Sequence, residues 1–249
     1  HEYVRPKNGF ARFLIAWMMK GIRQWDRLSA DRVDAFIANS NNVAKRIKKH
    51  YRRESKVIYP PVRTSMFKKS DTDEGYYLVV SRLVPYKRID LVAEAFTKLG
   101  LPLKIIGDGS EYKNVASKAG PTVEMLGRVD DETVLKYMQG CHAFLFPGEE
   151  DFGITPIEAE ACGKPVIALG KGGALETVEE NKTGVFFAEQ TVESVADAVE
   201  RFKKIEFDGD YIRKHAEKFS EERFRKELRE FFESEYEKFK NGQNVEDFE

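Results

Sequence analysis

Two carboxylates eight positions apart, Glu150 and Glu158, have the spacing best suited to chemistry in this chain. The apolar run 143–146 before them predicts a buried strand that stops at a Pro-Gly pair. Thr155, with a proline behind it, marks a helix start. The two carboxylates therefore flank a helix N-terminus at the end of a strand. In an open α/β sheet ligands bind there, and the free N–H groups favour a phosphate.

Two cations, Arg82 and Lys87, follow the apolar run 77–80. Fixed cations can neutralise the charge that develops on a departing diphosphate. Such a pair would remove the need for a metal ion. The alternative is that both are ordinary surface cations before a helix.

Glu158 has a structural interpretation as well as a functional one. The segment Thr155-Pro-Ile-Glu158 matches a capping box, in which Thr155 caps the helix and Glu158 closes it. The functional interpretation is that this carboxylate accepts hydrogen bonds from the hydroxyl groups of a ligand.

Three motifs in order carry a family resemblance: Ser81-Arg-Leu-Val-Pro-Tyr-Lys87, the E-x7-E pattern of Glu150 and Glu158, and Gly170-Lys-Gly-Gly-Ala-Leu-Glu-Thr-Val178. Over residues 57–240 the chain resembles the retaining glycosyltransferases of family four, also called glycosyl transferases group 1, with the GT-B fold. The resemblance implies that Glu150 contacts the transferred sugar and that Glu158 holds the ribose. It also implies that Arg82 and Lys87 bind the donor diphosphate.

The same resemblance extends the expected site to backbone groups at strand ends and at the helix start. Gly107-Asp-Gly109 and Gly127-Arg-Val129 are candidates for the base pocket, or are simply turn glycines. The catalytic candidates are Glu150, Arg82 and Lys87, and the expected donor-binding set is Arg82, Lys87, Gly107, Gly127, Val129, Glu150, Phe152, Gly153, Ile154, Thr155 and Glu158.

The implied activity is transfer of a hexose with retention to a saccharide or lipid-linked acceptor. The version Glu-Glu-Asp-Phe-Gly-Ile-Thr-Pro at 149–156 is most similar to mannosyltransferases of polysaccharide biosynthesis, which use GDP-mannose. No cofactor and no nucleic-acid partner are expected. The alternatives are a non-catalytic nucleotide-sugar-binding fragment and a GT-B sugar-nucleotide epimerase.

Two D-x-D patterns, 71–73 and 208–210, match a metal signature of another glycosyltransferase fold. The first lies in a polar stretch and the second in a turn, so we interpret both as loop residues. His50, His142 and His215 lack partners at metal spacing. We expect no metal site.

Composition favours a reducing compartment and a protein that does not span a membrane. The chain has 249 residues and two cysteines, Cys141 and Cys162, which is too few for a disulfide framework. It shows no signal peptide and no apolar run of about 20 residues. We expect a cytoplasmic location, with an option of peripheral attachment to the inner membrane face. Because the chain starts at His1, we expect it to be a piece of a longer protein.

Charge is unevenly distributed. Residues 1–56 carry 14 Lys and Arg against 5 Asp and Glu, and the remainder carries 27 against 37. Apolar residues at helical spacing over 10–25 predict an amphipathic helix. This basic segment could contact an anionic membrane surface, or the helix could pack on protein.

The expected fold class is α/β. Residues 1–62 resemble the end of an N-terminal GT-B domain, 63–75 a linker, and 76–220 a Rossmann-like donor-binding domain. Residues 221–249 are expected to return to the N-terminal part. Six apolar runs alternating with helical stretches predict a parallel sheet covered on both faces. These runs are 77–80, 103–106, 123–126, 143–146, 166–169 and 185–187.

Overall fold

The chain divides into two compact units, His1–Tyr59 with Phe224–Glu249 and Pro60–Arg223. The structure is a computed structural model that describes residues 9–241. The parts of the predicted N- and C-terminal segments in 1–8 and 242–249 lie outside the described residues. The elements of the first unit are α1 (Gly9–Ala30), β1 (Ile37–Ala38), α2 (Asn41–Tyr51), β2 (Lys56–Val57) and most of α10 (Glu221–Lys240).

In the first unit, β1 and β2 pair in parallel around α2. Ser40 caps α2, because its side chain accepts a hydrogen bond from the N–H of Val43. The two strands have two residues each.

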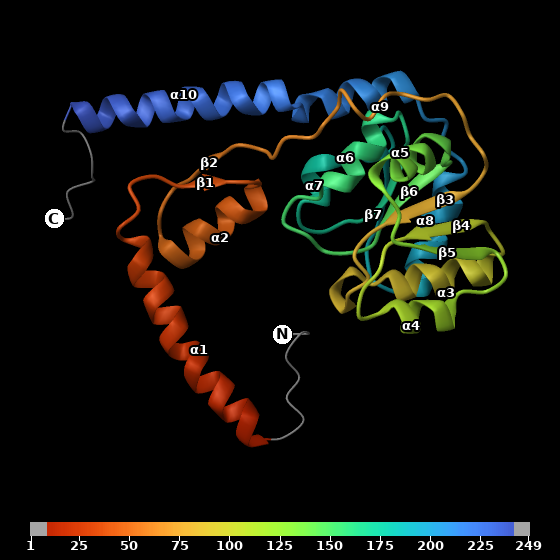
Figure 1. Cartoon of the computed structure of the whole chain (residues 1–249), viewed down its shortest axis with the longest axis horizontal. Helices are drawn as coiled ribbons and strands as arrows, with labels where there is room; N and C mark the ends of the chain where they lie inside the picture. Colours follow the sequence, from red (N-terminus) through yellow and green to blue (C-terminus); the bar gives the residue numbers. More distant parts are fainter. Residues whose placement is uncertain (1–8, 242–249) are drawn as a thin grey trace. The chain divides into compact units, whose positions relative to one another are not determined.

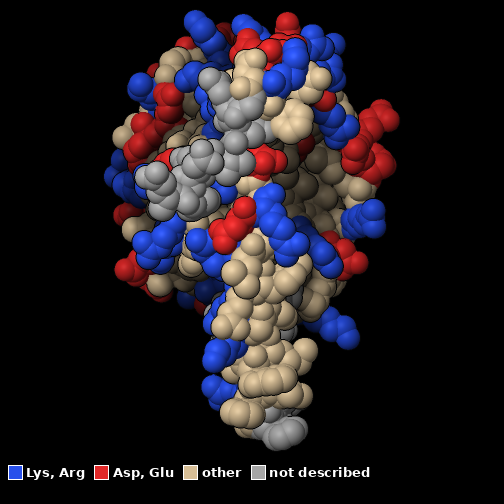
Figure 2. Space-filling view, turned by 90° about the vertical axis from the view of Figure 1, so that its left-hand side faces the viewer, with Lys and Arg blue, Asp and Glu red and all other residues tan. Residues whose placement is uncertain are grey.

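Helix α1 is amphipathic, as its spacing predicts. Phe13, Trp17 and Trp25 are 69%, 68% and 65% exposed, and Arg12 and Arg23 fall on the opposite side of a 3.6-residue turn. Figure 2 shows this helix as a continuous area without acidic or basic side chains, bordered by Lys and Arg. Two alternatives for α1 remain predictions: that its apolar face packs on protein, and that the basic segment contacts an anionic lipid surface. None of the described helices combines the length and apolar character that a bilayer span requires.

The second unit is built on an open parallel sheet with strand order β5-β4-β3-β6-β7-β8. Each strand is a short apolar run, and parallel strands buried on both faces need little polar alternation. The strands are β3 (Tyr77–Val80), β4 (Leu103–Ile106), β5 (Val123–Gly127), β6 (Ala143–Phe146), β7 (Val166–Leu169) and β8 (Gly184–Phe187). The predicted mixed α/β architecture with a parallel sheet is confirmed.

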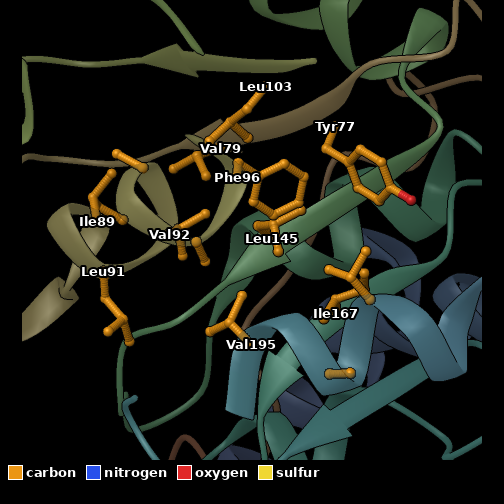
Figure 3. Close-up of a cluster of buried hydrophobic side chains, with 14 of the residues drawn as sticks. Tyr77, Val79, Ile89, Leu91, Val92, Phe96, Leu103, Leu145, Ile167 and Val195 are labelled. Carbon is orange, nitrogen blue, oxygen red and sulfur yellow. The ribbon is translucent and has the colours of Figure 1, made fainter. Parts of the chain in front are cut away.

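Helices cover both faces of this sheet (Figure 1). On one face, α3 and α8 pack on alternate strand residues in a buried cluster that includes Val79, Leu145 and Phe96 (Figure 3). On the other, α5 contacts β3, and α6 contacts β6 and β7. The helices are η1 (Pro85–Lys87), α3 (Ile89–Leu99), α4 (Tyr112–Lys118), α5 (Asp131–Gly140), α6 (Ile154–Ala161), α7 (Ala174–Thr177), α8 (Val192–Phe202), α9 (Gly209–Ala216) and η2 (Glu217–Phe219).

The segment 63–75, expected to be a linker, runs along the second unit. Its backbone donates hydrogen bonds to carbonyls after α6 and at the end of α5: Ser70 N–H to Cys162 and Glu74 N–H to Gly140. The Lys164 ammonium donates to the Thr72 carbonyl. These contacts hold the segment to the body that contains the sheet.

Candidate functional site

The sheet order places a switch point between the carboxyl ends of β3 and β6. From β3 the chain winds outward to β4 and β5, then returns to the other side of β3 to form β6. At such a reversal the two flanking helical connections leave on opposite faces, so the strand ends are not covered. The loop after β3 contains Arg82 and Lys87, and the loop after β6 contains Glu150.

The structure brings Lys87 and Glu150 together at this switch point. The Lys87 ammonium directly contacts the Glu150 carboxylate, and the two side chains are only 16% and 22% exposed. Burial lowers the pKa of Lys87 to about 8, because a low-dielectric environment disfavours the charged ammonium. A cation and a carboxylate from the segments after two different strands therefore meet at a partly buried position.

Close backbone packing determines how these two side chains meet. A Cβ atom at Gly148 would lie 3.2 Å from the Cα and Cδ atoms of Lys87. Glycine thus lets the turn after β6 press against the loop after β3. Arg88, the residue after Lys87, has φ 52° and separates η1 from α3. This left-handed residue ends the 3-10 turn directly after Lys87.

The loop that carries Glu150 is held from the other side by the Gly-Gly pair at 172–173. The Gly173 N–H donates a 2.8 Å hydrogen bond to the Glu150 carbonyl. A Cβ at Gly172 would overlap that carbonyl oxygen, and one at Gly173 would overlap the backbone of Phe152. Both glycines are needed for close approach, which explains the glycine-rich motif at 170–173.

Gly173→Ala is expected to lower the free energy of unfolding by about 1–3 kcal/mol, because the added methyl must displace the 150–152 backbone. Thermal unfolding followed by circular dichroism measures this loss. The matched control is Gly21→Ala in α1, where no atom lies within 4 Å of the added Cβ. That helical glycine should gain up to about 1 kcal/mol on replacement. An unchanged melting temperature for Gly173→Ala would contradict the packing described here.

Helix α6 starts two residues earlier than the capping box requires. Its N-cap is Gly153, with φ 92° and no side-chain cap, so Thr155 and Glu158 lie inside the helix. The predicted capping box is therefore wrong. A Cβ at Gly153 would lie 2.8 Å from Cζ of Phe146, so packing against the strand end sets this backbone conformation and the helix start.

The Glu158 carboxylate is half-buried, and no donor among the described residues lies within hydrogen-bond distance of it. Burial raises the pKa of Glu158, the nearby Arg63 guanidinium opposes this rise, and the Asp131 carboxylate adds to it. Arg63 and Asp131 form a 3.5 Å ion pair with each other. A half-buried acceptor without a protein donor is suited to ligand hydroxyl groups.

The other predicted residues lie around the same strand ends. Phe152 is buried, and its ring meets Phe219 at 5.7 Å between centroids, so only its backbone can serve a ligand. Arg82 is exposed, and in residues 9–241 it forms no ion pair or side-chain hydrogen bond. Ile154 is 43% exposed, and Thr155 is half-buried.

The glycines after β4 have a packing role. A Cβ at Gly107 would overlap the Ser81 carbonyl oxygen, and one at Gly109 would overlap that of Leu83. The Gly107 N–H also donates a 2.8 Å hydrogen bond to the Gly127 carbonyl. These contacts shape the loop that leads to Arg82 and Lys87. A base pocket at Gly107, Gly127 and the half-buried Val129 stays a prediction.

The D-x-D carboxylates take part in local interactions. Lys69 pairs with Asp71 at 2.9 Å and with Asp210 at 2.8 Å. Asp73 accepts from His142 at 2.7 Å, and Asp208 caps α9.

Some residues of this site were not among the predicted site residues. Gly148, Gly172 and Gly173 shape it through contacts with residues distant in sequence, and Arg63 lies near Glu158. The glycine run at 170–173 is visible in the sequence as a motif, but nothing local shows which loop it supports.

An open parallel sheet with cation and carboxylate loops at its switch point is the arrangement expected of a GT-B glycosyltransferase domain. The family model of glycosyl transferases group 1 matches residues 62–225. The chain belongs to this family.

Individual relatives agree with that membership. An uncharacterized glycosyltransferase of Methanocaldococcus jannaschii is 27% identical over 188 residues, which cover 74% of this chain and 53% of the relative. A GDP-mannose-dependent alpha-(1-6)-phosphatidylinositol monomannoside mannosyltransferase of Mycobacterium tuberculosis is 34% identical over 138 residues, 48% of this chain and 36% of the relative. The chain thus spans about half or less of the length of these curated relatives.

A solved structure shows the same fold. Anabaena HepE, in complex with UDP and glucose, aligns with a TM-score of 0.69 and 22% identity. The alignment covers 81% of this chain and 63% of that one. The predicted GT-B fold is confirmed.

Proposed function

We propose that this chain is the donor-binding part of a retaining glycosyltransferase that moves a hexose from a nucleotide sugar to a saccharide or lipid-linked acceptor. The observation that carries the proposal is the contact between Lys87 and Glu150 across the switch point of the sheet. This contact joins a half-buried cation to a half-buried carboxylate that lies a few residues before the start of α6. A sugar diphosphate has the complementary groups, an anion joined to a hydroxyl-rich ring.

Each polar group has a distinct part in the proposed reaction. Lys87, together with Arg82 and the N–H groups at the start of α6, neutralises the diphosphate as the bond from the sugar C1 to oxygen breaks. Glu150 accepts hydrogen bonds from the sugar hydroxyls and Glu158 from those of the ribose. The acceptor oxygen attacks C1 on the face from which the diphosphate leaves, and its proton passes to the leaving oxygen. Retention follows without a covalent enzyme intermediate, and no metal ion is required in this scheme.

The proposed donor is GDP-mannose. The family resemblance at 149–156 and the GDP-mannose dependence in the name of the Mycobacterium tuberculosis relative support this choice. The Anabaena structure holds UDP and glucose, which makes UDP-glucose the competing donor to test.

A second candidate function is binding of a nucleotide sugar without its transfer, which needs only the Lys87 and Glu150 groups at the switch point. Incubation with GDP-mannose and a range of saccharide acceptors separates the two functions. Mannosylated product would exclude the binding-only function, and an unchanged donor would favour it. An epimerase would instead convert the donor's sugar without any acceptor.

The deciding experiment is calorimetric titration of the chain with GDP, UDP and ADP, with and without magnesium. The expected result is preferential binding of GDP that does not depend on magnesium. A preference for UDP or ADP would overturn the mannose proposal but keep the transferase. Absence of binding to all three would contradict a complete donor site in this chain.

A further inference from the structure

The turn after β6 is tied to a residue that lies 43 positions further along the chain. The side-chain amide of Gln190 donates a 2.9 Å hydrogen bond to the Pro147 carbonyl. Pro147 is buried, and the hydrogen bond to its carbonyl is partly buried. A buried carbonyl that loses its donor pays a desolvation penalty, which makes the turn sensitive to residue 190.

Gln190 is itself held in place by the start of α8. The adjacent Thr191 caps this helix by accepting from the N–H of Ser194, and the Glu189 N–H donates to the Ser194 hydroxyl. In the sheet, β7 lies between β6 and β8. Gln190 follows β8 and Pro147 follows β6, so the hydrogen bond joins the segments after two strands that are not neighbours in the sheet.

The turn that Gln190 holds is the one on which the site depends. Gly148, the residue after Pro147, packs against Lys87. Glu150 lies three positions after Pro147 in the same segment. A shift of the Pro147 carbonyl would move the surface that buries Lys87 and the loop that presents Glu150 to it.

We propose that Gln190 is a positioning residue that fixes the 147–150 turn and thereby the meeting of Lys87 with Glu150. The importance of this geometry for donor binding rests on the function proposed above, but the positioning itself does not. Gln190 touches neither the cation nor the carboxylate, so its effect passes through the backbone of the turn.

The variants Gln190→Met and Gln190→Glu test this role. Methionine keeps the volume and removes the donor, and glutamate places an acceptor against the carbonyl. The chain offers a matched control in Gln139, whose amide also donates to a backbone carbonyl, that of Lys68, at 3.0 Å. Gln139→Met and Gln139→Glu therefore remove a similar, more exposed hydrogen bond next to the amino-terminal end of β6, at the opposite end of the strand from Pro147.

The first readout is the reactivity of Lys87 itself. Pulse labelling with acetic anhydride over pH 6–11, analysed by peptide mass spectrometry, gives the pH at which Lys87 titrates. In the wild-type chain this midpoint should lie near its pKa of about 8. Both Gln190 variants should move it toward the value of about 10.4 for an exposed lysine, and the Gln139 variants should not.

The second readout is GDP affinity, expected to fall about tenfold in the Gln190 variants and to be unchanged in the Gln139 variants. A wild-type Lys87 midpoint in both Gln190 variants would overturn the positioning role. If the wild-type chain binds no nucleotide, the proposed function fails, and the Lys87 midpoint still decides the role of Gln190. Melting temperatures identify a variant that fails to fold, in which case the milder methionine variant decides.

Discussion

Lys87→Ala is expected to weaken GDP binding by about 10- to 100-fold and to leave guanosine binding unchanged. A hydrogen bond to a charged group contributes about 1.5–3 kcal/mol, and about 1.4 kcal/mol corresponds to one factor of ten. The loss should be confined to ligands with a diphosphate because the Lys87 ammonium lies beside Glu150 at the strand ends. Calorimetric titration of the variant with both ligands measures the difference.

The pH dependence of GDP binding gives the same residue a second signature. Burial lowers the pKa of Lys87 to about 8, and an anionic ligand favours the protonated form. The complex therefore binds more protons than the free chain near this pH, so affinity should fall as the pH rises from 7 to 9.5. Lys87→Ala should abolish this decline.

An exposed lysine provides the control for both measurements. Lys98 on α3 pairs with Glu94 at i,i+4 and is 58% exposed, so Lys98→Ala should bind GDP with wild-type affinity. Equal losses of GDP and guanosine affinity in Lys87→Ala would show that the residue does not act on the diphosphate.

Glu158→Ala is expected to lower GDP affinity by about 1–3 kcal/mol, because two ribose hydroxyls lose their acceptor. The substitution should not destabilise α6, since Gly153 rather than a capping box starts this helix. Wild-type melting temperature with reduced affinity is thus the expected combination. A lower melting temperature with intact affinity would instead assign Glu158 to helix stability.

A comparison of GDP with 2′-deoxy-GDP localises this effect on the ribose. The wild-type chain should prefer GDP, and Glu158→Ala should bind both ligands equally. Glu158→Gln retains an acceptor oxygen without the charge and should lie between the two. Because burial raises the pKa of Glu158, affinity should also fall as the pH drops and the carboxylate becomes protonated. A preference for GDP that persists in Glu158→Ala would contradict ribose binding.

The strands of the second unit could be predicted well from local sequence. The apolar runs 143–146 and 166–169 coincide with β6 and β7, and the alternation of strand and helix signals identified a parallel sheet. These features depend on periodicity and on turn residues within a few positions, which a single sequence contains. Glu150, Glu158 and the two cations could be identified as site candidates for the same reason, since their motifs are short and contiguous.

Other features of the site depend on contacts between distant segments. The start of α6 is the clearest case: Thr155 and Pro156 have the composition of a helix start, yet packing of Gly153 against Phe146 starts the helix earlier. Glu158 thereby becomes a free acceptor instead of a capping residue. A capping signal is a local preference of about 1 kcal/mol, which close packing readily outweighs.

Local patterns along the chain specify the elements and the residue types that reach the carboxyl ends of the strands. The contacts of Lys87 with Glu150, of Gly173 with Glu150 and of Gln190 with Pro147 arise only in the folded chain. These pairs are separated by 23 to 63 positions, as their residue numbers show. The order of strands in the sheet brings them together, and that order minimises exposure of the whole apolar core, so no local pattern encodes it.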